Sequence, residues 1–249
     1  MLKSGLVSIT FRKLTPRQIV ELVQRAGLEG IEWGGDVHVP HGDLETAKSV
    51  RQLTQDAGLY TAAYGSYYRL GEPEPDFSAV LKTAKVLGAP TIRVWGGVRP
   101  SEKVDEEYYQ RIVEDARRIA RMAQTEGIVV ALEFHGGTIT DTNETTLRFL
   151  ADVAEPNLKS YWQPAVDVSV EYRIAGLKEL LPYLVNVHTF YWEPRHTRRA
   201  LAEGETVWKQ YLEVIKTSGK EHWLLVEFVR DDEPEAFMED AKTLLNWLR

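Results

Sequence analysis

The sequence contains no cysteine among its 249 residues. Disulfides, thiolate nucleophiles and cysteine-ligated zinc sites are therefore excluded. No apolar run approaches the roughly 18 residues of a membrane span, and the first residues lack the apolar core of a signal peptide. These absences predict a soluble cytoplasmic protein, and they direct the search for metal or acid-base chemistry to carboxylates and histidines.

Positively charged residues are fewer than negatively charged ones. The chain has 30 lysines and arginines against 37 aspartates and glutamates, which gives a formal net charge of -7. Binding to nucleic acid or to an anionic membrane needs a basic surface, so we expect neither partner. Glycine-rich phosphate loops of the GxGxxG and GxxxxGKS/T types are absent.

What is present is a repeated unit of a short apolar strand, a polar loop and an amphipathic helix that ends near a glycine. Eight strands are predicted, at residues 6–10, 30–34, 59–65 and 91–95, within 127–137, and at 158–163, 185–190 and 222–228. Eight such units close most naturally into one (β/α)8 TIM barrel over residues 1–249. An open doubly wound sheet is the alternative, but it would be expected to carry a glycine fingerprint after an early strand.

The stretch 127–137, GIVVALEFHGG, ends an apolar strand with a carboxylate. A buried parallel strand is expected to be a continuous apolar run, so packing does not explain Glu133. Moving a carboxylate away from water costs several kcal/mol unless it is paired or coordinated. The sequence therefore predicts a partner for Glu133.

Strand alternation indicates where that partner lies, because successive strand residues point alternately into the barrel and out to the helices. Glu133, His188 and Glu227 share the inward parity near the carboxyl ends of predicted strands, where barrel enzymes hold their active sites. Two carboxylates and an imidazole suit Mn²⁺, Mg²⁺ or Co²⁺, with Zn²⁺ as a further option. The plain alternative is that the glutamates are solvent-facing strand ends and that His188 is an ordinary buried histidine.

These residues resemble those of the xylose isomerase-like superfamily of TIM barrels, which includes sugar isomerases, ketose 3-epimerases, inosose dehydratases and apurinic-site endonucleases. The likeness covers nearly the whole chain and rests on Gly30-Ile-Glu-Trp33, Ala131-Leu-Glu133, Val187-His188 and Val226-Glu-Phe228. It implies one divalent ion held by a glutamate, an aspartate, a histidine and a second glutamate, with the two glutamates as acid and base. Three of these match Glu133, His188 and Glu227.

The fourth ligand departs from the family pattern. Where the resemblance implies an aspartate at the end of the sixth strand, this sequence has Gln163, and the nearest acid is Asp167, beyond Pro164. We favour Gln163, whose neutral oxygen binds a hard cation more weakly than a carboxylate does, with Asp167 as the alternative. The family's endonucleases carry a histidine three residues after that aspartate. Here those positions are Val166 and Val170, which argues against a multi-metal DNA-repair site.

The resemblance implies proton abstraction from a carbon next to a carbonyl, through an ene-diolate that a divalent ion stabilises. Return of the proton to the opposite face gives epimerisation, return to the adjacent carbon gives isomerisation, and loss of a β-hydroxyl gives dehydration. The sequence does not choose among these outcomes. We therefore expect a sugar isomerase or epimerase, with an inosose-type dehydratase or a non-catalytic sugar-binding barrel as alternatives.

A substrate-binding wall is expected around the ion, because aromatic rings offer apolar faces on which sugar rings stack. The candidate substrate-binding residues are strand-end and loop residues: His38, Tyr68, Arg93, Trp95, Trp192 and Arg195. Arg93 needs a buried partner, for which Glu32 is the candidate. No glycine-rich nest follows the last strand, which favours a free sugar or cyclitol over a sugar phosphate. The aromatic loops are compatible with a homodimer.

Overall fold

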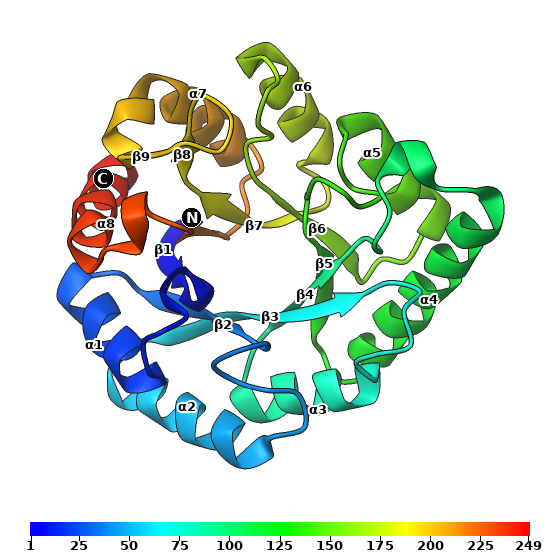
Figure 1. Ribbon diagram of the computed structural model, residues 1–249, viewed down its shortest axis with the longest axis horizontal. Helices are drawn as coiled ribbons and strands as arrows, with labels where there is room; N and C mark the ends of the chain where they lie inside the picture. Colours follow the sequence, from blue (N-terminus) through cyan, green and yellow to red (C-terminus); the bar gives the residue numbers. More distant parts are fainter.

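The predicted strand regions pair side by side in the computed structural model, which describes residues 1–249 (Figure 1). The eight barrel strands run parallel and close in the order β1-β10-β7-β6-β5-β4-β3-β2. Their bounds are β1 (Leu2–Val7), β2 (Gly30–Gly34), β3 (Tyr60–Arg69), β4 (Thr91–Trp95), β5 (Val129–Leu132), β6 (Leu158–Trp162), β7 (Leu184–Thr189) and β10 (His222–Val226). This closed parallel barrel confirms the (β/α)8 prediction.

Helices form a ring around the barrel in Figure 1. Local caps fix where they start: Thr15, for example, forms a capping box with Gln18 ahead of the first turn of α1. The helices are α1 (Pro16–Ala26), α2 (Leu44–Asp56), α3 (Phe77–Leu87), α4 (Glu106–Gln124), α5 (Asn143–Val153), α6 (Val170–Leu180), α7 (Glu205–Lys216) and α8 (Pro234–Leu248). Short 3₁₀ helices are η1 (Ser8–Phe11), η2 (Ser101–Lys103), η3 (Leu201–Gly204) and η4 (Arg230–Asp232). None of the helices has the length and apolar character that crossing a membrane requires.

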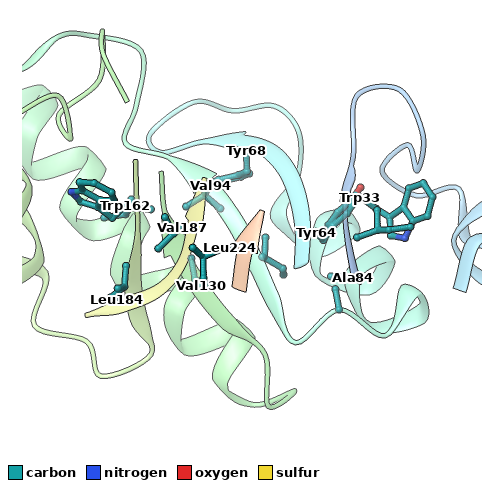
Figure 2. Close-up of a cluster of buried hydrophobic side chains, with 14 of the residues drawn as sticks. Trp33, Tyr64, Tyr68, Ala84, Val94, Val130, Trp162, Leu184, Val187 and Leu224 are labelled. Atoms are coloured by element: carbon teal, nitrogen blue, oxygen red, sulfur yellow. The ribbon is translucent and has the colours of Figure 1, made fainter. Parts of the chain in front are cut away.

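Most of the hydrophobic core lies between the barrel and the helices. Strand residues of one parity point outward into it, and Figure 2 shows Val130 and Leu224 among these buried side chains. A smaller buried cluster contains inward-facing strand residues such as Ala131 and Leu225, together with Ile9 of η1. Its members are Val7, Ile9, Ala62, Ala63, Ala131, Tyr161, Trp223 and Leu225. Ala131 precedes Glu133 by two residues, so this interior cluster lies one layer below the polar strand ends.

The first strand begins and ends earlier than the predicted range of 6–10. β1 covers Leu2–Val7 because Leu2 to Leu6 pair in register with β10, and η1 begins at Ser8. The Ser8 hydroxyl accepts a hydrogen bond from the Gly34 backbone N at 2.9 Å, which fixes this turn at the carboxyl end of β1. The predicted range extends too far because the residues of η1 are buried like those of a strand, although they form a 3₁₀ helix.

Two short strands outside the barrel form a hairpin shortly after β7. They are β8 (Tyr191–Trp192) and β9 (Arg198–Arg199), and they pair in antiparallel register. Because β8 starts only two residues after the end of β7, the hairpin belongs to the loops at the carboxyl end of the barrel. It therefore adds an aromatic residue, Trp192, to the face where barrel enzymes hold their active sites.

Candidate metal centre

The three predicted ligands come from three strand ends at one face of the barrel. Glu133 directly follows β5 and Glu227 directly follows β10, and His188 is the penultimate residue of β7. Backbone bonds extend the sheet to both glutamates: Glu133 N donates to Val94 O at 2.9 Å, and Glu227 N donates to Thr189 O at 3.1 Å. The rigid sheet therefore sets the direction of each side chain.

The side chains of these three residues converge. One potential ligand atom from each of Glu133, His188 and Glu227 lies within 4.8 Å of the others. His188 Nδ1 is 3.7 Å from Glu133 Oε1 and 3.4 Å from Glu227 Oε2. All three residues are buried, with exposures of 3%, 0% and 4% respectively. The convergence that strand parity predicts is therefore present, and the alternative of solvent-facing strand ends does not describe this arrangement.

Gln163 lies beside the same imidazole. Its Oε1 is 3.0 Å from His188 Nδ1, and the residue is half-buried directly after β6. Asp167, the alternative fourth ligand, is exposed and has a positive φ of 58° in the loop before α6. Of the two candidates, the structure brings Gln163 to the cluster.

Arg93, from β4, joins this cluster to a further carboxylate. Its Nε donates to Glu32 Oε1 at 2.7 Å, and its Nη1 pairs with Glu133 Oε2. This leaves Glu133 Oε1, the atom nearer His188, as the oxygen that faces the other candidate ligands. The expected partnership of Arg93 with Glu32 is therefore confirmed, and the guanidinium is 1% exposed and engaged by two carboxylates.

Burial and neighbouring charges have opposite effects on the pKa values of Glu32 and His188. Burial alone raises the pKa of the Glu32 carboxyl, but the Arg93 guanidinium and His188 lower that pKa to about 2. Burial lowers the pKa of the His188 imidazole, whereas the carboxylates of Glu227 and Glu32 raise it to about 10. The site therefore favours positive charge at its centre, because several carboxylates surround it.

The chemistry and spacing of the donors fit one divalent ion. Two carboxylates, an imidazole and an amide oxygen form a mostly oxygen donor set that suits Mn²⁺, Mg²⁺ or Co²⁺. Donors about 2.1 Å from a shared ion lie at most about 4.2 Å from one another. The separations of up to 4.8 Å among the donor atoms of Glu133, His188 and Glu227 therefore need only a small closure.

Aromatic side chains lie near the carboxyl ends of β4 and β7, the strands that carry Arg93 and His188. Trp95, at the end of β4, stacks on His135 with ring centroids 4.5 Å apart. Trp192 stacks on Phe190 at 4.0 Å and lies 6.2 Å from the ring of Phe228, the residue after Glu227. The indole Nε1 atoms of both tryptophans are buried without a hydrogen-bond partner. Trp95 and Trp192, both predicted substrate-binding residues, therefore each have an indole N–H without an acceptor.

Tyr68 does not belong to this face, and its prediction as a substrate-binding residue is wrong. Its ring packs against Phe77 of α3 with centroids 5.1 Å apart, and its hydroxyl donates to Asp115 of α4 at 2.8 Å. Figure 2 shows it in the same buried cluster as Val94. The pairing of β3 with β4 shifts register between Gly65 and Tyr68, which interrupts simple alternation.

His38 and Arg195 are also placed differently from the prediction. His38 is buried, and both ring nitrogens face protein groups, with Nδ1 2.9 Å from Ser8 Oγ and Nε2 3.2 Å from Leu14 O. Its contacts are those of a structural histidine. Arg195 is exposed, has a positive φ of 56° in the β8–β9 turn and forms no ion pair. Arg198 is instead the hairpin arginine that covers the ring of Phe228, at 4.9 Å.

Three further residues lie at the site, of which Tyr161 and His135 were not predicted. Tyr67 adopts a positive φ of 57° and places its ring 5.4 Å from the Arg93 guanidinium. Tyr161, within β6, packs edge-on against His188 with centroids 5.1 Å apart. His135 follows Glu133 by two residues. In a strand this spacing places two side chains on the same face, and it was the signal in the sequence that could have identified His135. The register shift in β3 hides the orientation of Tyr67 from any reading of the sequence.

Comparison with known proteins agrees with this architecture. A family model described as "Xylose isomerase-like TIM barrel" matches residues 20–249. A 3-dehydroshikimate dehydratase from Bacillus anthracis is 25% identical over 204 residues, which cover 75% of this chain and 71% of that protein.

Solved structures show the same fold. A probable 3-DHS dehydratase from Bacillus anthracis has a TM-score of 0.81 at 21% identity, over 99% of this chain and 99% of that one. A D-psicose 3-epimerase, crystallised in the presence of D-fructose, has a TM-score of 0.78 at 20% identity, over 99% of this chain and 98% of that one. Because the family match spans most of the sequence, the chain belongs to the xylose isomerase-like TIM barrel family.

Proposed function

We propose that this chain is a divalent-metal-dependent enzyme that removes a proton from the carbon next to a carbonyl in a sugar or cyclitol. The observation that carries the proposal is the convergence of Glu133, His188 and Glu227 at the carboxyl end of the barrel. A dehydratase relative and an epimerase with the same fold support it, because both reactions can begin with this proton abstraction.

The two glutamates are the acid and the base of this proposal. β6 and β7 separate the strands that carry Glu133 and Glu227, so the two carboxylates approach the centre from different sides. One can remove a proton from a substrate carbon while the other returns a proton to the opposite face. Glu133 forms an ion pair with Arg93, whereas Glu227 has no arginine partner.

His188 and Gln163 complete the donor set that would hold the ion, together with both glutamates. A bound divalent ion supplies a Lewis acid that polarises the substrate carbonyl. Trp95 and Trp192 would bind the substrate from either side, because a buried indole N–H without a partner gains a full hydrogen bond from a substrate hydroxyl. Burial of the cluster excludes bulk water from the reacting carbon.

A dehydratase is the second candidate outcome at the same site. The named dehydratase relative favours it, and so does His135, a half-buried imidazole two residues after Glu133. Dehydration needs a group that delivers a proton to a leaving hydroxyl, and histidine performs this role near neutral pH. Epimerisation needs only the two glutamates. The two reactions therefore differ in their dependence on His135.

Hydrogen exchange with solvent tests the proposal directly. The Mn²⁺-loaded protein is incubated in D₂O with a panel of ketoses, inososes and 3-dehydroshikimate, and NMR follows deuterium at each carbon. We expect deuterium next to the carbonyl, together with either an epimer or a dehydrated product. Glu133→Gln and Glu227→Gln should each slow the exchange by about 10²-fold or more, and His135→Gln should slow only a dehydration.

Glu126→Gln is the matched control, because Glu126 pairs with Lys85 on the outer surface. It should exchange at the wild-type rate. Metal-loaded protein that binds members of the panel but exchanges none of their protons would contradict the enzymatic proposal. That result would favour a barrel that binds a sugar without turnover.

A further inference from the structure

Glu32 and His188 meet across the barrel interior, and each has an unfilled hydrogen-bonding group on the side that faces the other. Glu32 lies on β2 and His188 on β7, and both are 0% exposed. Glu32 Oε2 lies 3.6 Å from His188 Nε2, and neither atom has a hydrogen-bond partner. A buried polar atom without a partner is unfavourable, so a small closure that joins these two atoms is favourable.

The remaining atoms of both residues already have partners. Glu32 Oε1 accepts a hydrogen bond from Arg93 Nε at 2.7 Å, which anchors the carboxylate. His188 Nδ1 faces the ligand cluster, 3.4 Å from Glu227 Oε2 and 3.0 Å from Gln163 Oε1. The imidazole therefore stands between a buried carboxylate on its Nε2 side and the candidate metal centre on its Nδ1 side.

We propose that Glu32 is the positioning residue of the metal centre. Its Oε2 accepts the Nε2–H of His188, which keeps the proton off Nδ1 and turns the Nδ1 lone pair toward the ion. The inference rests on the proposed function, because it requires that the centre bind a divalent ion. Histidine ligands commonly donate their second ring N–H to a carboxylate, which fixes the tautomer and the orientation of the ring.

Other contacts of His188 do not supply this acceptor. Tyr161 packs edge-on against the ring and limits its rotation, but its hydroxyl accepts a hydrogen bond from Asn186 Nδ2 at 2.8 Å. No hydrogen bond joins Nε2 to any other group in the protein. Glu32 is therefore both in reach of this nitrogen and free to accept from it.

Glu32→Gln is the informative variant. The amide oxygen can keep the bond from Arg93 Nε, which turns the amide NH₂ toward His188 Nε2 and places a donor where an acceptor is required. This favours the tautomer with a proton on Nδ1, which cannot bind the ion. We expect the Mn²⁺ dissociation constant, measured by calorimetry, to rise about 10- to 100-fold.

A spectroscopic measurement separates positioning from general damage to the fold. In the Zn²⁺-loaded wild type, proton NMR should show a slowly exchanging imidazole N–H signal that His188→Gln removes. Glu32→Gln should remove the same signal. Glu29→Gln is the control, because Glu29 accepts hydrogen bonds only from Ser4, ahead of the start of β2. It should keep both the signal and the wild-type affinity for Mn²⁺.

The outcomes distinguish this inference from the proposed function. A folded Glu32→Gln protein with wild-type Mn²⁺ affinity and an unchanged N–H signal would overturn the positioning role alone. A wild-type protein that binds none of Mn²⁺, Mg²⁺, Co²⁺ and Zn²⁺ would overturn both. If Glu32→Gln does not fold, Glu32→Asp keeps the carboxylate at a shorter reach. We then expect a weaker loss of affinity with the N–H signal retained, and loss of that signal would count against the inference.

Discussion

Arg93 and Glu32 form an ion pair inside the barrel, with Nε 2.7 Å from Oε1 and side-chain exposures of 1% and 0%. Arg93 also pairs with Glu133, so one guanidinium connects side chains from β2 and from the end of β5. Removing one partner of a buried pair leaves an uncompensated charge in a site with little water. This is far more costly than losing an exposed pair.

Arg93→Met should therefore destabilise the metal-free protein by about 3–5 kcal/mol. Urea denaturation followed by circular dichroism measures this change in the free energy of unfolding. Arg148→Met is the control, because Arg148 forms an exposed i,i+4 pair with Asp152, and it should cost less than about 1 kcal/mol. Equal losses in the two variants would show that Glu32 and Glu133 do not depend on Arg93.

Gly65→Ala should disturb the same ion pair without changing any charge. A Cβ at this position would lie 2.6 Å from Arg93 Nη2 and 2.9 Å from Glu32 Oε1. Overpacking of this kind typically costs about 1–3 kcal/mol, and the displaced carboxylate should also weaken Mn²⁺ binding. Gly136→Ala is the matched control, because a Cβ there meets nothing within 4 Å. In thermal melts, Gly65→Ala should show a lower Tm than Gly136→Ala. Its Tm should also rise less when Mn²⁺ is added.

The convergence of three polar side chains could be predicted from the sequence because the strands that carry them alternate regularly up to their carboxyl ends. In such strands parity decides which side chains point inward, and this placed Glu133, His188 and Glu227 correctly. Barrel closure then brings the inward strand ends together without further information. The fold and the identity of the converging residues both follow from local pattern.

What the sequence could not reveal depends on interrupted alternation and on contacts across the barrel. A register shift in β3 turns Tyr68 to the helices and leaves Tyr67 near Arg93. The approach of Glu32 to His188 joins strands that are not neighbours. Such a contact is set by barrel radius and side-chain length, which no strand-by-strand pattern contains.

Divalent ions should stabilise the folded protein against heat. An ion at 100 times its dissociation constant adds about 2.7 kcal/mol of stability if it binds only the folded state. For a chain of this size that is roughly 5–10 °C in Tm. His188→Gln should abolish the shift with Mn²⁺, whereas His196→Gln, an exposed hairpin residue, should keep it. A wild-type Tm that does not respond to any of the four candidate ions would contradict the predicted metal centre.

Asp240→Asn should stabilise the protein above neutral pH. Burial raises the pKa of the Asp240 carboxyl from 3.8 to about 6, although the side chain accepts a hydrogen bond from Leu201 N at 2.7 Å. The folded state thus holds a proton more tightly than the unfolded state, and stability falls as pH rises from about 4 to 6. The amide keeps the acceptor without the charge. We expect a gain of about 2 kcal/mol at pH 7.5 that disappears near pH 4, measured by urea denaturation.

The protonation of His188 predicts a pH dependence of the metal-free protein. Burial lowers the pKa of this imidazole, but Glu227 and Glu32 raise it to about 10, above its ordinary value of 6.5. The stability gained from the charged imidazole is therefore complete below pH 6.5 and is lost as pH rises toward 10. In EDTA-treated protein, the free energy of unfolding should fall from pH 7 to 9.5 by up to about 1.4 kcal/mol per pH unit.

His188→Gln should flatten this decline, and His196→Gln should leave it unchanged. A divalent ion and a proton compete for Nδ1 of His188, so metal binding requires release of that proton. Mn²⁺ affinity measured by calorimetry should therefore rise with pH by up to about tenfold per unit over the same range. If the affinity is independent of pH while the stability still falls, then another group carries the titration, and His188 is not the nitrogen ligand.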